Sequence, residues 1–489
     1  MTAEYFEARE RALLGPRYDS LYAAPGPDAA RGVTVSALRM DRAAFAAGAG
    51  FGIEPSPFCP DAFVVREPGF KPGRHPWHHA GVFYAQEPSA AAAAPLLGVR
   101  PGMRVLDLCA APGGKSSQLA AALGGQGLLV ANEYVPARAE VLKGNLERMG
   151  VRNAVVLNES PERVAAALPA FFDRVLVDAP CSGEGMFRKE PAALAQHSPA
   201  LVAQCAALAA SILDCAAEAL APGGELLFST CTFAPEEDEG QAAAFLARHP
   251  DFALADVMER AFAPFGSPGE ANRTGGLPLD AGLVRRIWPC QGGEGHFMAR
   301  FVKAGGPAWD ELDDGQRAAR AAEEAAWLAR MQRPQPAKRA AKGRRQAPAP
   351  AVSAAQVLEV WRAFAAERFP ALAGAPAAAL GESVLLPPAC PPLGLHILRA
   401  GVLAGTVQKG RFVPAHHLFT AYGGQCASIE PLTMADPRCA AYLAGQEIEA
   451  KAAAPGWCCV TVDGCPLGGG KVSGGRVKNH YPRALRLLG

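Results

Sequence analysis

The chain reads RVLDLCAAPGGKSSQLAAAL from Arg104 to Leu123. A short apolar strand ends at Asp107, a loop of small residues follows, and a helical pattern begins at Lys115. Small residues let the backbone amides of such a loop approach a ligand closely, and the start of a helix attracts negative charge. The sequence therefore predicts a strand–loop–helix unit that binds a ligand.

Strand and helix patterns alternate around this unit, between about residues 91 and 305. This alternation is typical of parallel βαβ units in a doubly wound, Rossmann-like α/β sheet. We expect strands at 104–107, 127–131, 153–157, 174–177 and 224–228, and helices at 115–123, 136–149 and 199–220. The segment 296–302 is expected to close the sheet as an antiparallel edge strand.

Two further strand ends carry a thiol. Cys181 lies in Asp178-Ala179-Pro180-Cys181-Ser182-Gly183, and Cys231 lies in Ser229-Thr230-Cys231-Thr232-Phe233. Residues just past the carboxyl ends of parallel strands line the ligand crevice of an α/β sheet. We therefore expect the glycine-rich loop and both cysteines to surround one pocket, which suits a nucleotide-like cofactor beside a cysteine nucleophile.

The loop from Cys109 to Lys115 lacks the GxxxxGK[ST] pattern of a phosphate-binding loop. It fits S-adenosylmethionine better, with the loop around the amino-acid end of the cofactor. Glu133 closes the next strand, where an acid can accept hydrogen bonds from both ribose hydroxyl groups. The alternative is an ordinary turn with a helix-capping acid, but loop, strand and acid together favour the cofactor.

A thiol in this pocket suits methylation of a pyrimidine. Carbon 5 of cytosine is a poor nucleophile, and addition of a thiolate at carbon 6 makes the ring an enamine whose carbon 5 can attack a methyl group. Asp178 stands at the right strand end to engage the nitrogen edge of the ring. A second thiol can assist product release. Chemistry alone does not decide which cysteine attacks, and Cys181 is a candidate by its position after Pro180.

The length of 489 residues favours two to four domains. We expect an N-terminal α+β unit at 1–90, the α/β domain at 91–305, a helix with a basic Pro/Ala-rich linker at 306–352, and a mainly β region at 353–489 that opens on a helix at 354–368. The net charge is only +1, but no acidic residue interrupts the basic stretches 333–345 and 471–489. Such stretches can contact phosphates, and a solvated tail is the alternative.

Several features favour a cytoplasmic protein. The first seven residues are polar and acidic, unlike a signal peptide, and we find no uninterrupted apolar run long enough to cross a bilayer. The 13 cysteines form no dense framework, which is typical of reduced thiols. Cys458, Cys459 and Cys465 lack CxxC spacing, so we expect no metal. The sequence does not indicate an oligomeric state, and a monomer is the default.

The motifs together resemble the Sun-type RNA (cytosine-5) methyltransferases, and in detail the RsmF-like ribosomal RNA methyltransferases. The resemblance lies in DLCAAPGGKSSQ (107–118), Asn132-Glu133 with Arg138 and Asn145, DAPCSGEGMFRK (178–189), STCTF (229–233), and the segments 86–90 and 293–297. It covers residues 1–305 well. Residues 401–422 and 456–488 resemble the family's PUA-like RNA-binding extension more loosely.

The resemblance implies roles that spacing does not assign. Cys231 would be the nucleophile, and Cys181 would assist product release. Asn158 or Glu159 would contact the adenine of the cofactor. The residues that would contact the cofactor or the target base are Cys109, Ala110, Ala111, Pro112, Gly113, Gly114, Lys115, Glu133, Arg138 and Asp178. The N-terminal unit and the C-terminal region would both bind RNA.

Small-subunit ribosomal RNA is then the expected substrate, and Arg188 and Lys189 are candidates to hold its phosphates. Because target choice resides in the terminal regions, the same chemistry on transfer RNA is an alternative. A non-catalytic RNA-binding assembly factor is a third hypothesis, against which the intact Cys181, Cys231 and cofactor loop argue. An amine methyltransferase is disfavoured, because the fourth strand ends in Asp-Ala-Pro-Cys rather than [DNS]PP[YF].

Overall fold

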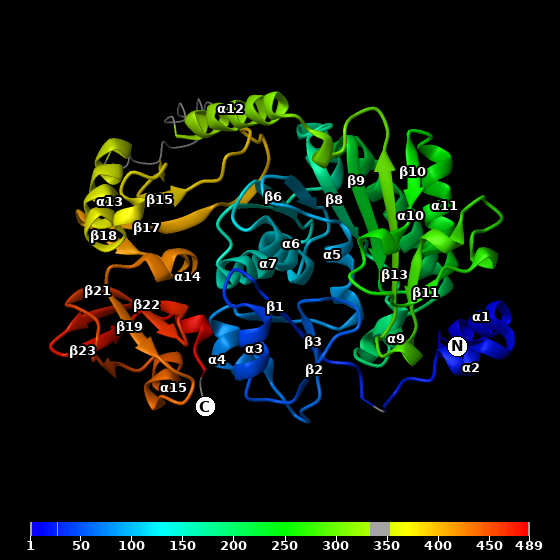
Figure 1. The fold of residues 1–489 in the computed structure, drawn as a ribbon, viewed down its shortest axis with the longest axis horizontal. Helices are drawn as coiled ribbons and strands as arrows, with labels where there is room; N and C mark the ends of the chain where they lie inside the picture. The colour runs from blue at the N-terminus through cyan, green and yellow to red at the C-terminus, as the bar shows by residue number, and fades with distance from the viewer. Residues whose placement is uncertain (1, 27, 333–352, 488–489) are drawn as a thin grey trace, which may run out of the picture.

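The computed structural model describes residues 2–26, 28–332 and 353–487. Ten of the described strands form one central sheet (Figure 1). Its five parallel strands are β5 (Arg104–Asp107), β6 (Leu128–Asn132), β7 (Ala154–Leu157), β8 (Phe172–Asp178) and β9 (Leu220–Thr230). They lie in the order β9-β8-β5-β6-β7, so the strand order reverses between β5 and β8. A ligand crevice is expected at the carboxyl ends of the strands at such a reversal.

Helices cover both faces of this sheet. Val105 and Leu129 pack beneath one layer, and Leu106 and Val130 beneath the other, because successive side chains of a strand point to opposite faces. The first layer contains α5 (Ala93–Leu96), α6 (Gly114–Leu123) and α7 (Pro136–Met149). The second contains α8 (Pro161–Ala167), α10 (Pro199–Ala219) and α11 (Glu239–Arg248).

The predicted alternation of strands and helices is confirmed over 104–230. Helix α7 has the predicted bounds, and most strand ends differ from the predicted ones by one or two residues. Strand β9 begins four residues before the predicted Gly224. Its first residues include Pro222 and Gly223, which local patterns exclude from a strand.

Strand β13 (His296–Lys303) is antiparallel to β9, as expected, but the prediction that it lies at the edge is wrong. Both β10 (Phe252–Ala255) and β12 (Arg285–Ile287) pair with it, and β11 (Ser267–Pro268) pairs with β12. Segments of two to four residues are too short to show a periodic pattern, so the sequence did not indicate them.

The opposite edge of the sheet is closed by a strand from the C-terminal region. Strand β16 (Ile397–Ala400) pairs antiparallel with β7, with Ala400 opposite Val155. The segment lies more than 90 residues beyond β13, so only the tertiary structure reveals this pairing.

The N-terminal residues form helices α1 (Thr2–Leu14) and α2 (Tyr18–Leu21) and a small sheet. Helix α1 packs against α9 (Pro191–Gln196), and Figure 1 shows the two together at one end of the molecule. The small sheet has the order β2-β3-β1-β4, and is accompanied by α3 (Arg42–Gly48) and α4 (Pro76–His79). Its strands are β1 (Gly32–Val35), β2 (Ile53–Pro55), β3 (Ala62–Val65) and β4 (Phe83–Ala85).

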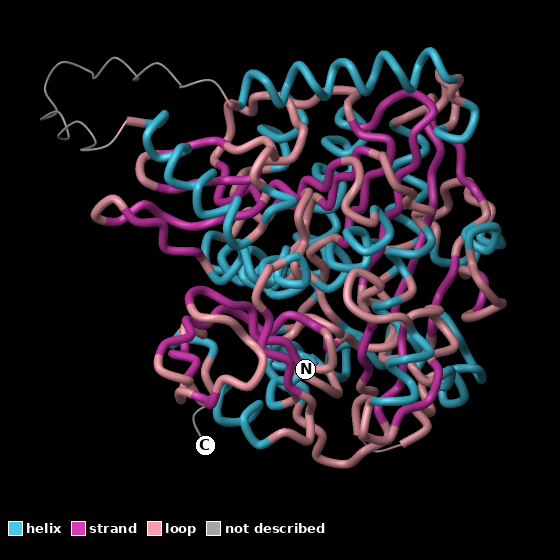
Figure 2. The backbone as a smooth tube through the Cα atoms, turned by 60° about the vertical axis from the view of Figure 1, so that its left-hand side comes forward, coloured by secondary structure: helices cyan, strands magenta, loops and turns pink. Residues whose placement is uncertain are grey.

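Beyond β13, helix α12 (Asp314–Met331) runs along one side of the molecule (Figure 2). The predicted basic linker falls largely on residues 333–352, which lie outside the described residues. Helix α13 (Ala354–Arg368) occupies the predicted residues, and α14 (His416–Tyr422) and α15 (Pro437–Leu443) follow. The remaining strands form two sheets: β14 (Ala378–Leu380), β15 (Ser383–Leu386), β17 (Val402–Gln408) and β18 (Arg411–Pro414), and β19 (Ile429–Leu432), β20 (Ile448–Glu449), β21 (Gly456–Val462), β22 (Cys465–Ser473) and β23 (Arg476–Asn479).

Helix α10 is long and apolar. By length and composition alone it could cross a membrane, although Gln204 and Asp214 interrupt its apolar residues, so it is not the uninterrupted apolar run whose absence was expected. In the structure α10 packs against α8, β8 and β9, where Ile212, Leu213 and Ala216 are buried in the core. A helix that is buried in the core of a folded protein is expected to be apolar in the same way.

Candidate active site

The loop between β5 and α6 is tightly built. Asp107 Oδ2 accepts a hydrogen bond of 2.6 Å from Ser116 Oγ, in the first turn of α6. Gly113 has a φ of +111°, which residues with a side chain rarely adopt. A Cβ on Gly114 would lie 3.2 Å from the Tyr84 ring. The two glycines are thus needed for different reasons, one for its backbone conformation and one for close packing.

A cavity of about 220 Å³ opens at the carboxyl ends of β5, β8 and β9. The predicted residues that line it are Cys109, Ala110, Ala111, Pro112, Gly114, Lys115, Asp178 and Cys231. Gly113 is buried within the loop, and Cys181 contacts Cys231 at the cavity wall. The structure therefore brings the three strand ends together around one pocket.

The two thiols are in direct contact. The Sγ atoms of Cys181 and Cys231 are 3.4 Å apart, within hydrogen-bond distance for sulfur. The hydrogen bond with Cys231, together with burial, raises the pKa of Cys181 well above the ordinary value of a thiol. Cys181 therefore keeps its proton at neutral pH and can donate it toward the Cys231 sulfur. Of the two cysteines, only Cys231 lines the cavity.

Hydrogen bonds tie the loops of the two cysteines together. Ser182, next to Cys181, shares a hydrogen bond of 2.8 Å with Thr232, next to Cys231. The Gly185 N–H donates to the carbonyl of Cys231 at 2.9 Å. Glu237 accepts from both the N–H and the hydroxyl group of Ser182. These contacts fix the distance between the two sulfur atoms.

Lys115 and Asp178 form an ion pair at the floor of the cavity. Lys115 Nζ lies 2.8 Å from Asp178 Oδ2, and Ser229 Oγ donates to Asp178 Oδ1 at 2.8 Å. Burial by itself raises the pKa of Asp178, but Lys115, with smaller effects from His296 and Ser229, outweighs burial and holds that pKa below its ordinary value. The side chain is still 34% exposed. An ionised Asp178 can therefore accept a hydrogen bond from a group in the cavity.

The cavity fits a cofactor that carries positive charge. Asp107 lines it, and among the described residues Asp107 Oδ1 is buried without a hydrogen-bond partner. Burial, and to a smaller degree the neighbouring Asp178, raise the pKa of Asp107 to about 7. A bound cation would stabilise its ionised form. The small side chains of Ala110 and Ala111 leave the loop backbone accessible from the cavity.

Glu133, Arg138 and Asn158 lie outside the cavity wall but are connected to it. Arg138 Nη2 donates to the carbonyl of Ala111 at 2.9 Å, and Arg138 Nη1 lies 3.5 Å from Glu133 Oε2. The Asn158 amide donates to the carbonyls of Glu133 and Tyr134, each at 2.8 Å. Asn158 thus joins the end of β7 to the loop after β6, and its expected contact with adenine stays a prediction.

Some cavity residues were not assigned a role from the sequence. Tyr84, Gln86 and Glu87 come from β4 and the segment after it, and Met186 and His296 complete the wall. Gln86, Glu87 and His296 lie in the segments 86–90 and 293–297, which resemble the family. That resemblance is the signal that marks these segments, but it does not say which side chains face the cavity.

The two candidate phosphate-binding residues differ in the structure. Arg188 is engaged by the protein itself, because its guanidinium group donates to Glu294 and to the carbonyls of Gly26 and Asp28. Lys189 is exposed and lines the cavity. Of the two, only Lys189 lines the cavity, and the role of both residues stays a prediction.

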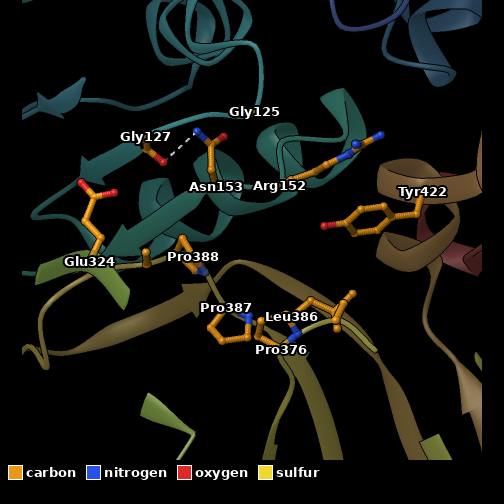
Figure 3. A pocket seen from close by; sticks show the side chains of 12 residues that line it. Gly125, Gly127, Arg152, Asn153, Glu324, Pro376, Leu386, Pro387, Pro388 and Tyr422 are labelled. Atoms are coloured by element: carbon orange, nitrogen blue, oxygen red, sulfur yellow. Dashed lines mark hydrogen bonds between the residues drawn. The ribbon is translucent and has the colours of Figure 1, made fainter. Parts of the chain in front are cut away.

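A second cavity, of about 380 Å³, lies at the other end of the parallel strands (Figure 3). Its wall includes Gly127 and Asn153, which directly precede β6 and β7, and Glu324 of α12. At one end the Arg152 guanidinium group lies 4.5 Å from the centre of the Tyr422 ring. It contains no residue of the predicted site.

The three cysteines near the end of the chain lie apart from the cavity. Cys458, Cys459 and Cys465 are buried among the strands of the C-terminal sheet. Within residues 2–26, 28–332 and 353–487, no group of three or more His, Cys, Asp or Glu side chains is arranged to hold a metal ion.

Comparison with known proteins identifies the family. The model of the 16S rRNA methyltransferase RsmB/F matches residues 94–302, and the N-terminal domain of 16S rRNA methyltransferase RsmF matches residues 3–88. The first C-terminal domain of the RsmF rRNA methyltransferase matches 363–421, and the methyltransferase RsmF PUA domain matches 431–487. The chain belongs to the RsmB/F family. This is a family of S-adenosylmethionine-dependent methyltransferases, so the expected cofactor and fold class are confirmed.

Named relatives and solved structures agree with membership in the RsmB/F family. The ribosomal RNA small subunit methyltransferase F of Cronobacter sakazakii is 36% identical over 304 residues, 60% of this chain and 61% of that protein. The protein of the same name from Escherichia coli is 36% identical over 58% of this chain and 60% of its own length. The chain thus spans about 60% of the length of these relatives. A methyltransferase homologue from Pyrococcus horikoshii has a TM-score of 0.54 and 27% identity, and covers 61% of this chain and 95% of its own.

Proposed function

We propose that this protein methylates carbon 5 of cytosine in small-subunit ribosomal RNA, with S-adenosylmethionine as donor and a covalent bond between Cys231 and the base. The observation that carries the proposal is the pair of thiols, 3.4 Å apart, at a cavity bounded by the loop 109–115. Membership in the RsmB/F family and the names of its relatives support ribosomal RNA as the substrate. A cytoplasmic location would follow from that substrate.

The chain offers a complete set of groups to hold the cofactor. The loop from Cys109 to Lys115 would surround its amino-acid end, and Asp107 would face its positive charge. Glu133, Arg138 and Asn158 would contact the nucleoside part of the cofactor. When bound, S-adenosylmethionine supplies an electrophilic methyl group.

The first step would be attack by Cys231 on the target base. The Cys231 thiol gives its proton to solvent, a bond forms between its sulfur and carbon 6, and the electron pair of the C5–C6 double bond moves to carbon 5. Carbon 5 then takes the methyl group as the bond between that group and the donor's sulfur breaks. Asp178 accepts a hydrogen bond from the 4-amino group of cytosine and so orients the ring. Cys181 can donate its S–H toward the Cys231 sulfur, which lies 3.4 Å away.

The second step would be release of the product by Cys181. Once Cys231 is bonded to carbon, the hydrogen bond that raises the pKa of Cys181 is weakened, although burial still raises that pKa. Cys181 gives its proton to solvent and then takes the proton from carbon 5. The electron pair of that C–H bond re-forms the C5–C6 double bond, and the bond between carbon 6 and Cys231 breaks to leave the Cys231 thiolate. The distance of 3.4 Å between the two sulfur atoms supports this role.

Binding of RNA would involve the terminal regions. The N-terminal and PUA family models support this assignment, and Lys189 stands exposed at the cavity. A target base inside a stack must be extruded to reach this depth, so a single strand or a flipped nucleotide is required. Both naked RNA and an assembled small subunit can present such a nucleotide.

The test is transfer of a radiolabelled methyl group to unmodified small-subunit ribosomal RNA. Wild type should transfer, Cys231→Ala should not, and Cys290→Ala, which changes an exposed thiol outside the site, should match wild type. Full activity of Cys231→Ala would refute the mechanism. Bisulfite sequencing of RNA from a deletion strain locates the methylated nucleotide. If methylation is lost from transfer RNA and not from ribosomal RNA, transfer RNA is the substrate. Failure to bind S-adenosylmethionine by calorimetry would favour a non-catalytic role.

A further inference from the structure

The imidazole of His296 is a buried polar group that the steps above leave unused. His296 begins β13, which is antiparallel to β9, so it lies at the sheet edge where the parallel strands end. Phe297 pairs with Thr230, which places His296 beside Cys231. His296 lines the cavity and is 2% exposed. It is therefore part of the pocket in which the base would react.

Neither ring nitrogen of His296 has a partner at hydrogen-bond geometry among the residues that the structure describes, although the Gly295 backbone lies close enough to raise the pKa of the ring slightly. The nearest acid is Asp178, whose Oδ1 lies 4.0 Å from His296 Nε2, beyond hydrogen-bond distance. Buried polar atoms in native proteins are almost always paired, so an unpaired group in a cavity calls for a partner. A ligand group inside the cavity would supply that partner.

His296 is neutral at physiological pH. Burial, and then the Lys115 ammonium group, lower its pKa to about 3, against smaller raising effects from Asp178 and the Gly295 backbone. A neutral imidazole donates through one nitrogen and accepts through the other. His296 can therefore donate one hydrogen bond to a neutral acceptor without bringing a charge into the cavity.

The polar groups of the cavity complement cytosine. The hydrogen-bonding edge of cytosine presents one donor, the 4-amino group, followed by two acceptors, nitrogen 3 and oxygen 2. Three of the polar groups on the wall match this order: the ionised Asp178 is an acceptor, and Lys115 and an N–H of His296 are donors. Uracil has a carbonyl in place of the 4-amino group and an N–H at position 3. Bound in the same way, uracil would place an acceptor opposite Asp178 and a donor opposite the N–H of His296, so neither hydrogen bond would form.

We infer that His296 is a specificity-determining residue, which donates a hydrogen bond to an acceptor on the edge of the target cytosine. The inference rests on the proposed function and names the group that completes recognition of the base. Loss of this donor would leave a buried acceptor of the base unpaired, which lowers the rate by about 10- to 100-fold. It would also weaken the discrimination between cytosine and uracil.

The experiment compares three variants on two transcripts of small-subunit ribosomal RNA. One transcript carries the mapped target cytidine, and the other carries uridine at that position. His296→Phe keeps an aromatic ring without nitrogen, and His296→Gln restores an N–H donor. His249→Phe is the matched control, because His249 lies at the end of α11 and pairs with Asp214 at the surface. The measurements are kcat and KM for methyl transfer, and calorimetric binding of S-adenosylmethionine to each variant.

For His296→Phe we expect kcat/KM on cytidine to fall about 10- to 100-fold, the cytidine-to-uridine preference to fall, and cofactor affinity to stay within about twofold. His296→Gln should regain much of the loss, and His249→Phe should match wild type. Unchanged kcat/KM for His296→Phe would overturn the inference. An equal loss on both bases, or a parallel loss of cofactor affinity, would show a packing role instead. Absence of transfer by the wild type would refute the proposed function itself.

Discussion

Arg9 donates two hydrogen bonds to the carboxylate of Glu184, at 2.9 and 2.7 Å, across 175 residues of chain. Glu184 follows Cys181 by three residues, and its Oε2 also accepts from the N–H of Phe233, two residues after Cys231. The Glu184 side chain is fully buried. Helix α1 therefore holds the carboxylate that joins the loops of both cysteines, and we propose Arg9 as a positioning residue for this pair.

Substitution Arg9→Ala should destabilise the protein and slow methyl transfer. It leaves Glu184 buried without its main cation, and breaking a buried pair costs about 3 kcal/mol. Urea denaturation measures the free energy of unfolding, and kcat for methyl transfer reports whether the two cysteine loops keep their positions. The control is Arg11→Ala on the same helix, whose exposed ion pairs with Glu7 and Asp19 should matter little. Equal behaviour of the two variants would remove the positioning role.

Substitution Cys181→Ala should trap the protein on RNA. Without a second sulfur, removal of the proton from carbon 5 is slow, so the bond between Cys231 and the base persists. A more slowly migrating band on a denaturing gel, sensitive to ribonuclease, would report the adduct. Cys231→Ala and the double variant should give no such band. A Cys181→Ala protein that turns over normally would contradict the release role.

Substitution Lys115→Met should make methyl transfer more sensitive to acid. In the wild type Lys115 keeps the pKa of Asp178 below its ordinary value, against the raising effect of burial. Without the cation that pKa rises, and a protonated Asp178 is a weaker acceptor that can turn an O–H donor toward the 4-amino group of cytosine. The ratio of kcat/KM at pH 8 to that at pH 5.5 should increase, by about tenfold for each unit by which the pKa of Asp178 exceeds 5.5. The same ratio in Lys115→Met and wild type would contradict the assignment.

Substitution Asp107→Asn should change how stability depends on pH in protein without added cofactor. Burial raises the pKa of Asp107 from 3.8 to about 7, so between these values the folded state binds more protons than the unfolded state. The wild type therefore loses stability as pH rises through this window, by about 2 kcal/mol between pH 5 and pH 7 from this group.

In Asp107→Asn the decrease in stability that Asp107 causes between pH 5 and pH 7 should disappear. Urea denaturation at the two pH values measures it, and Asp314→Asn, at an exposed position, serves as the control. An identical pH dependence in Asp107→Asn and wild type would show that Asp107 is not protonated in the folded state.

Local patterns were enough to predict the parallel strands, their helices and the loop 109–115. Strand β5, helix α7 and helix α13 have the predicted bounds, because hydrophobic periodicity and the proline and glycine positions are local properties. The topology rule for parallel strands then predicted that Asp178, Cys231 and the loop would meet. The resemblance, rather than any spacing, supplied the roles of the two cysteines.

The tertiary structure alone decided the contacts between distant segments. Strand β16 joins β7, Arg9 reaches Glu184, and His296 lines the cavity with both nitrogens unpaired among the described residues, and local patterns reveal none of these contacts. Sequence periodicity reports which face of an element is buried but not against which partner. The choice of partner depends on the packing of the whole chain, and that packing determined how the site is held.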